Sequence, residues 1–276
     1  MSKVQIQAKL YLLNYADDRL GHKGAVFKES QRALNESARR HGIRHIVSWG
    51  WPDLASTEFY REHKEYLDRP YHLNGFVFKP YITLRLLEEI DYGDMVLYYD
   101  SGNGGHVIDY PLEPLIRLCL ENQGTVFHQW GEKNSKWTKR DCFVYMNCDE
   151  PRYHNAVHLQ ATWFVLQKTD FALKFAREWL GYTLDERIAS YENRRVCGLP
   201  DLPEFCENRG DQSVFSNLAV KYRLPTFYGA GGPANRSIGN FVRSLSIGGW
   251  LRARALKHAM AARTHLARVK RTLVGP

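Results

Sequence analysis

Strand-like and helix-like segments alternate along the first hundred residues, and this alternation limits the chain to few architectures. Residues 9–15 and 43–49 hold large apolar and β-branched side chains, which favour strands, and residues 28–41 between them have helical spacing. Residues 80–90 repeat the helical spacing, and the apolar run 96–99 follows. Strands that alternate with helices usually pair in parallel, with the helices covering the sheet. We therefore expect an α/β fold with a mixed, mainly parallel sheet and helices on both faces.

The expected elements continue through the second half of the chain with less regularity. Residues 57–66 are typical of a charged surface helix. The remaining expectations are a helix at 112–121, strands at 125–129, 141–146 and 159–168, a helix that begins at Thr169 or Asp170 and runs to Trp179, a loop at 197–208 and a helix at 211–221. No internal repeat is visible, so one large domain accounts for most of the chain.

The apolar strand at 96–99 ends abruptly in Asp100, Ser101 and Gly102. In an open α/β sheet, ligands bind outside the carboxyl ends of the strands. A carboxylate at such a place can hold a divalent cation against a diphosphate, and the small residues after it leave room for the phosphates. An ordinary Asp-Ser-Gly turn explains the same residues, because all three are common in turns.

Composition excludes several classes of protein. No run of about twenty apolar residues is present, and the N-terminus lacks the apolar core of a secretion signal, so we expect neither a membrane span nor export. Five scattered cysteines without C-x-x-C spacing favour reduced thiols in a cytoplasm over disulfides or a zinc site. The sequence holds no P-loop, no G-x-G-x-x-G and no Ser-His-Asp order.

Positive charge is concentrated near the C-terminus. The formal net charge is +8, and residues 212–276 hold eleven lysines and arginines with no acidic residue. Within Trp250–Leu273, aliphatic residues recur at spacings of three and four, and basic residues fill the remaining circumference. This pattern predicts a helix that lies on an anionic membrane surface. The alternative is a helix that docks on the protein's own acidic body. We expect no nucleic-acid partner, because the sequence contains no recognisable nucleic-acid-binding module.

Several segments carry a resemblance that extends over most of the chain. Phe78–Ile82 reads Phe-Lys-Pro-Tyr-Ile, and Gly93–Gly102 reads Gly-Asp-Met-Val-Leu-Tyr-Tyr-Asp-Ser-Gly. Further on, Gln160 precedes an apolar run, Trp179 ends a helical segment, and Arg209–Ser216 reads Arg-Gly-Asp-Gln-Ser-Val-Phe-Ser. In this order and spacing, the chain resembles a family of bacterial and viral glycosyltransferases of surface-polysaccharide assembly with a GT-A-type fold.

The resemblance implies a GT-A-like domain, which we place at residues 1–235; the basic amphipathic helix, expected from its own charge pattern, accounts for residues 236–276. It also implies transfer of a sugar from a nucleotide-sugar donor to a glycan or lipid-linked glycan, such as a capsule, O-antigen or exopolysaccharide, at the cytoplasmic face of the membrane. Mn²⁺ or Mg²⁺ bound by Asp100 would hold the diphosphate. The family usually carries Asp-x-Asp, but here the second acid is replaced by Gly102, so metal-independent chemistry fits the residues as well.

The candidate site residues fall into three groups. They are Tyr15, Lys79, Tyr81, Asp100, Ser101 and Gly102 for the donor, Gln160, Trp163 and Arg209 for the acceptor, and Asp211 and Gln212 for catalysis. Lys79 stands at a helix start, where backbone N–H groups already favour anions, so we expect it to contact the donor's diphosphate. Asp211 is expected to deprotonate the attacking hydroxyl.

Each of these residues also has a plainer explanation. Lys79 could be a solvated or ion-paired surface lysine, and Tyr15 could be part of the core. Asp211 could cap its own helix, since aspartate is a common N-cap residue. Trp163 could be buried rather than form a platform for a sugar.

Two other functions remain open from the sequence. A nucleotidyltransferase acting on sugar phosphates shares the fold type, but such enzymes usually carry a Gly-rich basic loop after the first strand, which residues 12–24 match only in part. A non-catalytic module that binds a glycan or a nucleotide could retain the fold without a metal site. His128, His154 and His158 have no carboxylate or cysteine at zinc-like spacing, so they predict no metal centre.

Overall fold

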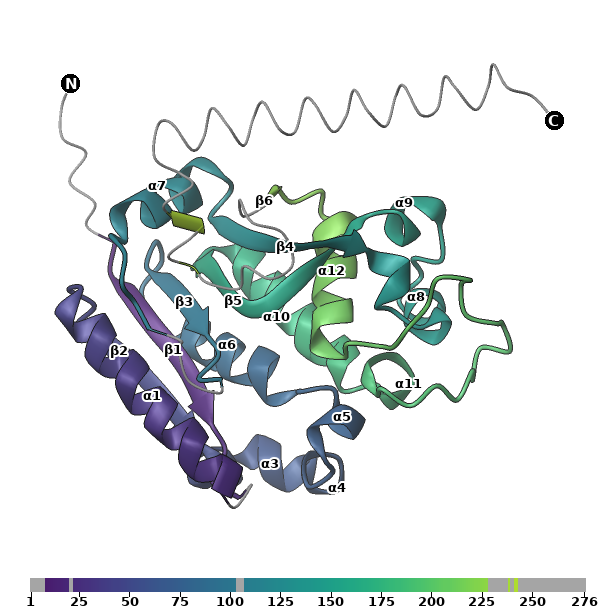
Figure 1. Cartoon of the computed structure of the whole chain (residues 1–276), viewed down its shortest axis with the longest axis horizontal. Helices are drawn as coiled ribbons and strands as arrows, with labels where there is room; N and C mark the ends of the chain where they lie inside the picture. The colour runs from purple at the N-terminus through teal and green to yellow at the C-terminus, as the bar shows by residue number, and fades with distance from the viewer. Residues whose placement is uncertain (1–7, 20–21, 103–106, 228–237, 239–240, 243–276) are drawn as a thin grey trace.

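The computed structural model describes residues 8–19, 22–102, 107–227, 238 and 241–242. Within them, six strands form one sheet of order β2-β1-β3-β5-β4-β6. The strands are β1 (Leu10–Ala16), β2 (His45–Gly50), β3 (Met95–Tyr99), β4 (Thr125–Lys133), β5 (Val157–Gln167) and β6 (Thr226–Phe227). In Figure 1, β1, β3, β5 and β4 follow one another across the molecule.

The sheet is mixed and mainly parallel, which confirms the prediction from the sequence. β1 pairs in parallel with β2 and with β3, and β4 pairs in parallel with β6. Within this sheet only β5 runs against its neighbours, β3 and β4. Five of the strands therefore share one direction, so their carboxyl ends lie along the same edge of the sheet. Asp100 follows β3 at this edge.

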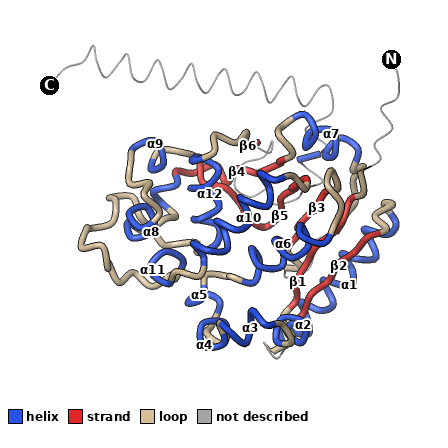
Figure 2. Tube along the Cα trace, turned by 180° about the vertical axis from the view of Figure 1, so that it is seen from behind, coloured by secondary structure: helices blue, strands red, loops and turns tan. Residues whose placement is uncertain are grey.

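Twelve helices accompany the sheet within the described residues. They are α1 (His22–Arg40), α2 (Trp51–Ala55), α3 (Glu58–Glu62), α4 (Lys64–Leu67), α5 (Tyr71–Asn74), α6 (Phe78–Glu89), α7 (Glu113–Glu121), α8 (Arg140–Tyr145), α9 (Pro151–His154), α10 (Asp170–Thr183), α11 (Glu186–Ala189) and α12 (Asp211–Lys221), with a 3₁₀ turn, η1, at Asn134–Lys136. Figures 1 and 2 show the molecule from opposite sides, and both place α3 and α4 beyond the end of β1.

Helices cover both faces of the sheet because successive strand residues point to opposite sides. In β3, Val96 and Tyr98 join the core under α6, α10 and α12. Leu97 and Tyr99 join the core on the other face, under α1 and α7. A strand that is buried on both faces must be apolar throughout, and β3 is fully buried along its length.

Two expected elements differ from the structure. Residues 141–146, expected as a strand, form most of α8. In α8 the Asp141 carboxylate accepts hydrogen bonds from the backbone N–H groups of Val196 and Cys197, at 3.0 and 2.7 Å. The helix thus forms in its tertiary context although Phe, Val and Tyr in this segment favour a strand locally. The single helix expected at 57–66 is divided into α3 and α4 at His63, whose backbone leaves the helical region.

Three described residues follow the domain boundary that the sequence indicates at residue 235. Ile238, Phe241 and Val242 are buried in the core under α1 and α7. The expected amphipathic helix at Trp250–Leu273 lies outside the described residues. Among the described residues, no helix combines the length and apolar character needed to cross a bilayer.

Candidate active site

Three charged side chains from distant parts of the chain meet beside the carboxyl end of β3. The ammonium of Lys79, from the first turn of α6, lies 3.3 Å from Asp100 Oδ1 and 3.4 Å from Asp211 Oδ2. Asp100 follows β3, and Asp211 is the first residue of α12. We call Asp100, Lys79 and Asp211 the acid–lysine cluster. All three were candidate site residues in the sequence, and the fold brings them together.

Lys79 is a buried residue, although the sequence suggests a surface lysine or one that touches a ligand. Its side chain is only 7% exposed, and its ammonium also donates a hydrogen bond to the Ala161 carbonyl, at 3.0 Å. Burial lowers the pKa of Lys79, but the two carboxylates outweigh burial and the pKa lies above its ordinary value. Lys79 is therefore charged at neutral pH, and protein atoms satisfy it. Direct contact between Lys79 and a diphosphate, as expected from the sequence, does not fit this geometry.

Asp100 is the more exposed of the two acids. Its side chain is 29% exposed, against 5% for Asp211. The Tyr98 hydroxyl donates a hydrogen bond to Asp100 Oδ1 at 2.7 Å, and the Asp100 backbone N–H donates to the Thr162 carbonyl at 2.8 Å. Two residues apart on an extended chain, Tyr98 and Asp100 point to the same side, so the hydroxyl can fix the carboxylate. Asp100 is thus held in place and still accessible.

Asp211 begins α12 but is not its cap. The N-cap is Gly210, which has a φ of +53° and provides no side-chain cap, so helix capping does not explain Asp211. A Cβ at Gly210 would lie 2.9 Å from the Gly75 Cα, and the Asp211 N–H donates to the Gly75 carbonyl at 2.9 Å. The close approach of these two glycines allows α12 to present Asp211 to Lys79.

Burial of Asp211 has an electrostatic consequence. It raises the pKa of the carboxyl to about 7; the nearby Asp100 carboxylate acts in the same direction, and the Lys79 ammonium opposes it. The charge partner of Asp211 Oδ2 is the Lys79 ammonium at 3.4 Å. A carboxyl group with such a pKa exchanges a proton near neutrality, which is the property required of a general acid or base.

Gln212 supports the site rather than facing a ligand. Its Oε1 accepts a hydrogen bond from the Ala161 backbone N–H at 3.3 Å, and Lys79 binds the carbonyl of the same residue. Gln212 and Lys79 together fix the middle of β5 against α12 and α6. The sequence predicted a catalytic role for Gln212; its contacts indicate a positioning role.

The other residues expected to bind the donor make contacts within the protein. Tyr15 is buried and stacks on Phe78, with 4.1 Å between the ring centroids, and Tyr81 is buried and stacks on Phe59 at 3.9 Å. The Ser101 hydroxyl donates to the Tyr15 carbonyl at 2.8 Å, which ties the end of β3 to the end of β1. Tyr15 and Tyr81 are both part of the core, as the plainer explanation has it. Gly102, with a φ of +39°, turns the chain away from the strand.

Two of the expected acceptor residues are turned away from the acid–lysine cluster. Trp163 has no exposed surface and packs against His128 and Phe241, at centroid distances of 5.2 and 5.1 Å. Gln160 is buried and hydrogen-bonded to His128 at 3.2 Å. Trp163 belongs to the core under α1 and α7, whereas Tyr98 belongs to the opposite face. The prediction of a sugar platform at Trp163 is wrong, because a fully buried ring has no face to offer.

Arg209 lies at the surface next to α12. Its guanidinium is 4.7 Å from the Trp137 ring centroid and 5.8 Å from that of Trp130, and it pairs with Glu207 at 2.5 Å. The Arg209 N–H also donates to the Trp137 carbonyl at 3.2 Å. This places a partly exposed cation and two indoles beside the start of α12, two residues before Asp211.

The sequence missed a second polar group at the same edge of the sheet. Asp17 follows β1, is buried, and accepts hydrogen bonds from Arg19 at 2.7 and 3.1 Å and from the Tyr71 hydroxyl. The Arg19 guanidinium lies over the Trp51 ring, 3.1 Å from its centroid. The signal was present, because Asp17 follows an apolar strand as Asp100 does. Tyr98 was missed because a tyrosine inside an apolar run resembles core.

The described residues do not fit a bound Mn²⁺ or Mg²⁺. No group of three or more His, Cys, Asp or Glu side chains among them is placed to hold a metal ion. The two acids of the cluster face Lys79 instead, whose charge would repel a divalent cation between them. We therefore assign no step of the reaction to the metal that the sequence resemblance implies.

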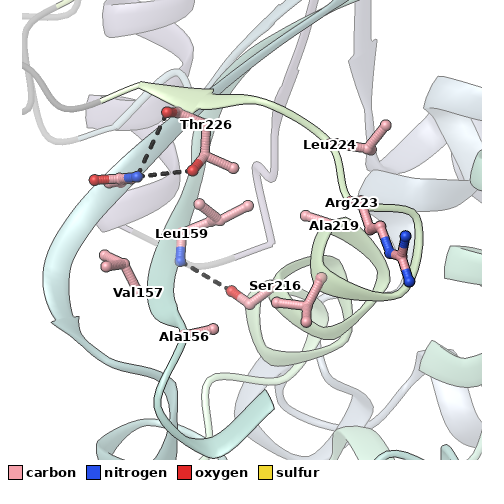
Figure 3. A pocket seen from close by; sticks show the side chains of 10 residues that line it. Ala156, Val157, Leu159, Ser216, Ala219, Arg223, Leu224 and Thr226 are labelled. Atoms are coloured by element: carbon pink, nitrogen blue, oxygen red, sulfur yellow. Dashed lines mark hydrogen bonds between the residues drawn. The ribbon is translucent and has the colours of Figure 1, made fainter. Parts of the chain in front are cut away.

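A cavity of about 290 Å³ lies elsewhere, between β5, β6 and the end of α12. Figure 3 shows Leu159 and Thr226 on one side of it and Ala219 and Arg223 on the other. A hydrogen bond of 2.9 Å from the Leu159 N–H to the Ser216 hydroxyl crosses its base. None of the candidate site residues lines this cavity.

Comparison with known proteins leaves the reaction open. No known protein family and no curated protein matches the sequence. Among solved structures, the chain is similar to the apo crystal structure of mouse xyloside xylosyltransferase 1, with a TM-score of 0.42 and 11% sequence identity. The similarity covers 80% of this chain and 85% of that one. A likeness at this level does not bear on substrates or mechanism.

Proposed function

We propose that the protein is a glycosyltransferase that uses a nucleotide-sugar donor. The observation that carries this proposal is the acid–lysine cluster. Its three members come from three of the segments on which the sequence resemblance rests, and they meet at the sheet edge where α/β proteins bind ligands. Gly93 and Asp94, from the same segments, lie at the other end of β3, where Asp94 Oδ1 accepts a hydrogen bond from the Lys9 N–H at 2.8 Å. Their role is structural.

The cluster suggests a division of work between the two acids. Asp100 is accessible, and a carboxylate accepts hydrogen bonds from sugar hydroxyls, so Asp100 binds and orients the sugar of the donor. In the transfer, the bond from the anomeric carbon to the diphosphate oxygen breaks and a bond to the acceptor oxygen forms. The acceptor's hydroxyl proton passes to Asp211, whose pKa of about 7 suits a base near neutral pH.

On the acceptor side, Arg209 is the member of the expected set that is partly exposed. A guanidinium beside two indoles can bind a charged or hydroxyl-rich glycan. The finer proposal is a surface glycan or lipid-linked glycan as acceptor, with the enzyme peripheral to the cytoplasmic face of a membrane through Trp250–Leu273. Replacing Arg263 and Arg268 with glutamate is expected to abolish flotation with anionic liposomes. Unchanged flotation would contradict the proposal that the protein binds a membrane through this segment.

The test of the main proposal combines binding and turnover. The wild-type protein is screened with UDP, GDP, UDP-glucose, UDP-galactose and GDP-mannose by thermal shift, and hydrolysis of each sugar nucleotide is followed by release of the nucleoside diphosphate. We expect one donor to raise the melting temperature and to be turned over. Asp100→Ala is expected to lower turnover by about 10²-fold or more, since it removes a preorganised polar contact.

The matched control is Asp91→Asn. Asp91 is an exposed acid at the opposite end of β3, paired with Lys9 at 2.9 Å, and we expect its replacement to leave turnover unchanged. Binding of a nucleotide without turnover would instead identify a non-catalytic module. Absence of binding to every nucleoside diphosphate and sugar nucleotide tested would refute the proposal.

A further inference from the structure

Two carboxylates that approach each other at a ligand-binding edge repel unless one of them takes up a proton or a positive charge lies between them. Asp100 and Asp211 both lie within 3.4 Å of one point, and the atom at that point is the Lys79 nitrogen. Without it, either Asp211 would take up a proton or the two carboxylates would repel each other, because water screens charge weakly around the buried Asp211. In many proteins a divalent cation fills such a position.

Lys79 is held in this position on all sides. An ammonium has three N–H groups, and three oxygens surround this one: the Ala161 carbonyl at 3.0 Å and the two carboxylates. The face of the Tyr98 ring lies 5.2 Å away, which adds a cation–π contact. With a side chain only 7% exposed, the lysine has no room to swing out of the site.

The same geometry works against a metal ion. Divalent cations bind carboxylate oxygens at about 2.0–2.6 Å, so an ion in place of the lysine nitrogen would have to draw both acids inward. It would also have to displace a charged side chain that is only 7% exposed.

We propose that Lys79 replaces a divalent cation in this site: its ammonium holds Asp100 and Asp211 together, so that the protein binds its substrate without a metal. The statement about substrate rests on the proposed function. The statement about the two carboxylates does not, because it concerns only this chain's own residues. Lys79 is thus a positioning residue, and its charge does what a bound metal would do for the two acids.

The test uses the full chain and Mn²⁺ or Mg²⁺ alone, without nucleotide. We expect the melting temperature of the wild-type protein to be the same in EDTA and in millimolar Mn²⁺. Lys79→Ala removes the charge and leaves space, so we expect a lower melting temperature in EDTA that Mn²⁺ raises again. At a concentration 100-fold above the dissociation constant, the rise should be roughly 5–10 °C.

Lys168→Ala is the matched control. Lys168 is also buried, but its ammonium donates to the carbonyls of Glu88 and Ile90, at 3.1 and 2.6 Å, and it forms no ion pair with a carboxylate of the described residues. This variant should lose stability without gaining a response to Mn²⁺. Lys79→Met, which removes the charge but fills the space, should respond to Mn²⁺ less than Lys79→Ala.

Two results would overturn the proposal. One is saturable stabilisation of the wild-type protein by Mn²⁺; the other is a folded Lys79→Ala variant that does not respond to the ion. If Lys79→Ala does not fold, the wild-type protein is titrated with Mn²⁺ and bound ion is measured by electron paramagnetic resonance. Bound Mn²⁺ in the wild type would contradict the proposal.

A separate experiment measures UDP and GDP binding in EDTA. Equal binding with and without Mn²⁺ supports metal independence, whereas no binding at all speaks against the proposed function only.

Discussion

Lowering the pH should reduce the stability of the folded protein through His158, a residue that supports α12 and therefore the site. The ring is fully buried, and its Nδ1 lies 2.8 Å from Asn134 Oδ1 and 3.4 Å from the Ser216 hydroxyl. The Asn134 amide nitrogen already donates to Asn217 Oδ1, so Asn134 Oδ1 is the acceptor and Nδ1 of the histidine carries the proton. Nε2 has no hydrogen-bond partner among the described residues, so a second proton there would be unsatisfied.

The magnitude follows from linkage between protonation and folding. Burial, assisted by the charge of Arg209, lowers the pKa of His158 to about 3, whereas an unfolded histidine titrates near 6.5. Because the folded-state pKa is depressed, the stability is present above pH 6.5 and is lost as the pH falls toward 3. At pH 5 His158 is protonated in the unfolded chain but not in the folded protein, which lowers the free energy of unfolding by about 2 kcal/mol relative to pH 7.

The assay is urea unfolding of the wild type and of His158→Asn at pH 7, 6 and 5. Asparagine places an amide nitrogen near the position of Nδ1 but does not titrate. The variant starts lower at pH 7 because it leaves a cavity, and its loss between pH 7 and 5 should be smaller than that of the wild type by about 2 kcal/mol. All other titrating groups are shared and cancel in this difference. Equal losses in the two proteins would show that His158 takes up protons in the folded state, which would contradict its burial.

Three further predictions concern the site itself. The rate of sugar transfer should fall about tenfold per pH unit below the Asp211 pKa near 7. Asp211→Asn removes the base, so it should abolish this acidic limb of the pH–rate profile together with most of the rate; an acidic limb that persists in the variant would belong to another group. Gly210→Ala should cost about 2–3 kcal/mol in urea unfolding, since a φ of +53° strains an alanine and its Cβ would press on the Gly75 Cα at 2.9 Å; a cost below about 0.5 kcal/mol would mean that the backbone relaxes. Tyr98→Phe removes the 2.7 Å hydrogen bond to Asp100 and should cost about 1–2 kcal/mol while lowering kcat/KM for the donor, with Tyr92→Phe, an exposed tyrosine, as the control.

Local pattern was sufficient for most of the fold. α12 was found because its apolar residues follow the period of a helix, and β1 and β3 because each is a short, nearly continuous apolar run of strand length. The segment that forms α8 was misassigned because it is short and rich in strand-favouring residues; in the structure its Asp141 side chain binds the distant loop at Val196 and Cys197. Short apolar runs do not distinguish strand from helix by themselves.

The candidate site was only partly predictable for a related reason. Asp100 was identified because its position at the end of an apolar strand is visible in the sequence. The aromatic residues Tyr15, Tyr81 and Trp163 were assigned to ligands, yet the same residue types fill cores, and only packing shows which role applies. Lys79 was expected to meet a ligand, because the sequence could not show that Asp211 and the Ala161 carbonyl would occupy its ammonium.

The sequence by itself therefore determined most of the order of strands and helices along the chain and the position of an acid directly after β3. These properties depend on residues close together in the chain. The tertiary structure alone decided that a buried lysine stands between Asp100 and Asp211, that the pKa of Asp211 is raised, and that Asp100 is partly exposed while Asp211 is not. Charge and burial depend on neighbours that the fold brings together from α6, β3 and α12, and no local pattern records those neighbours.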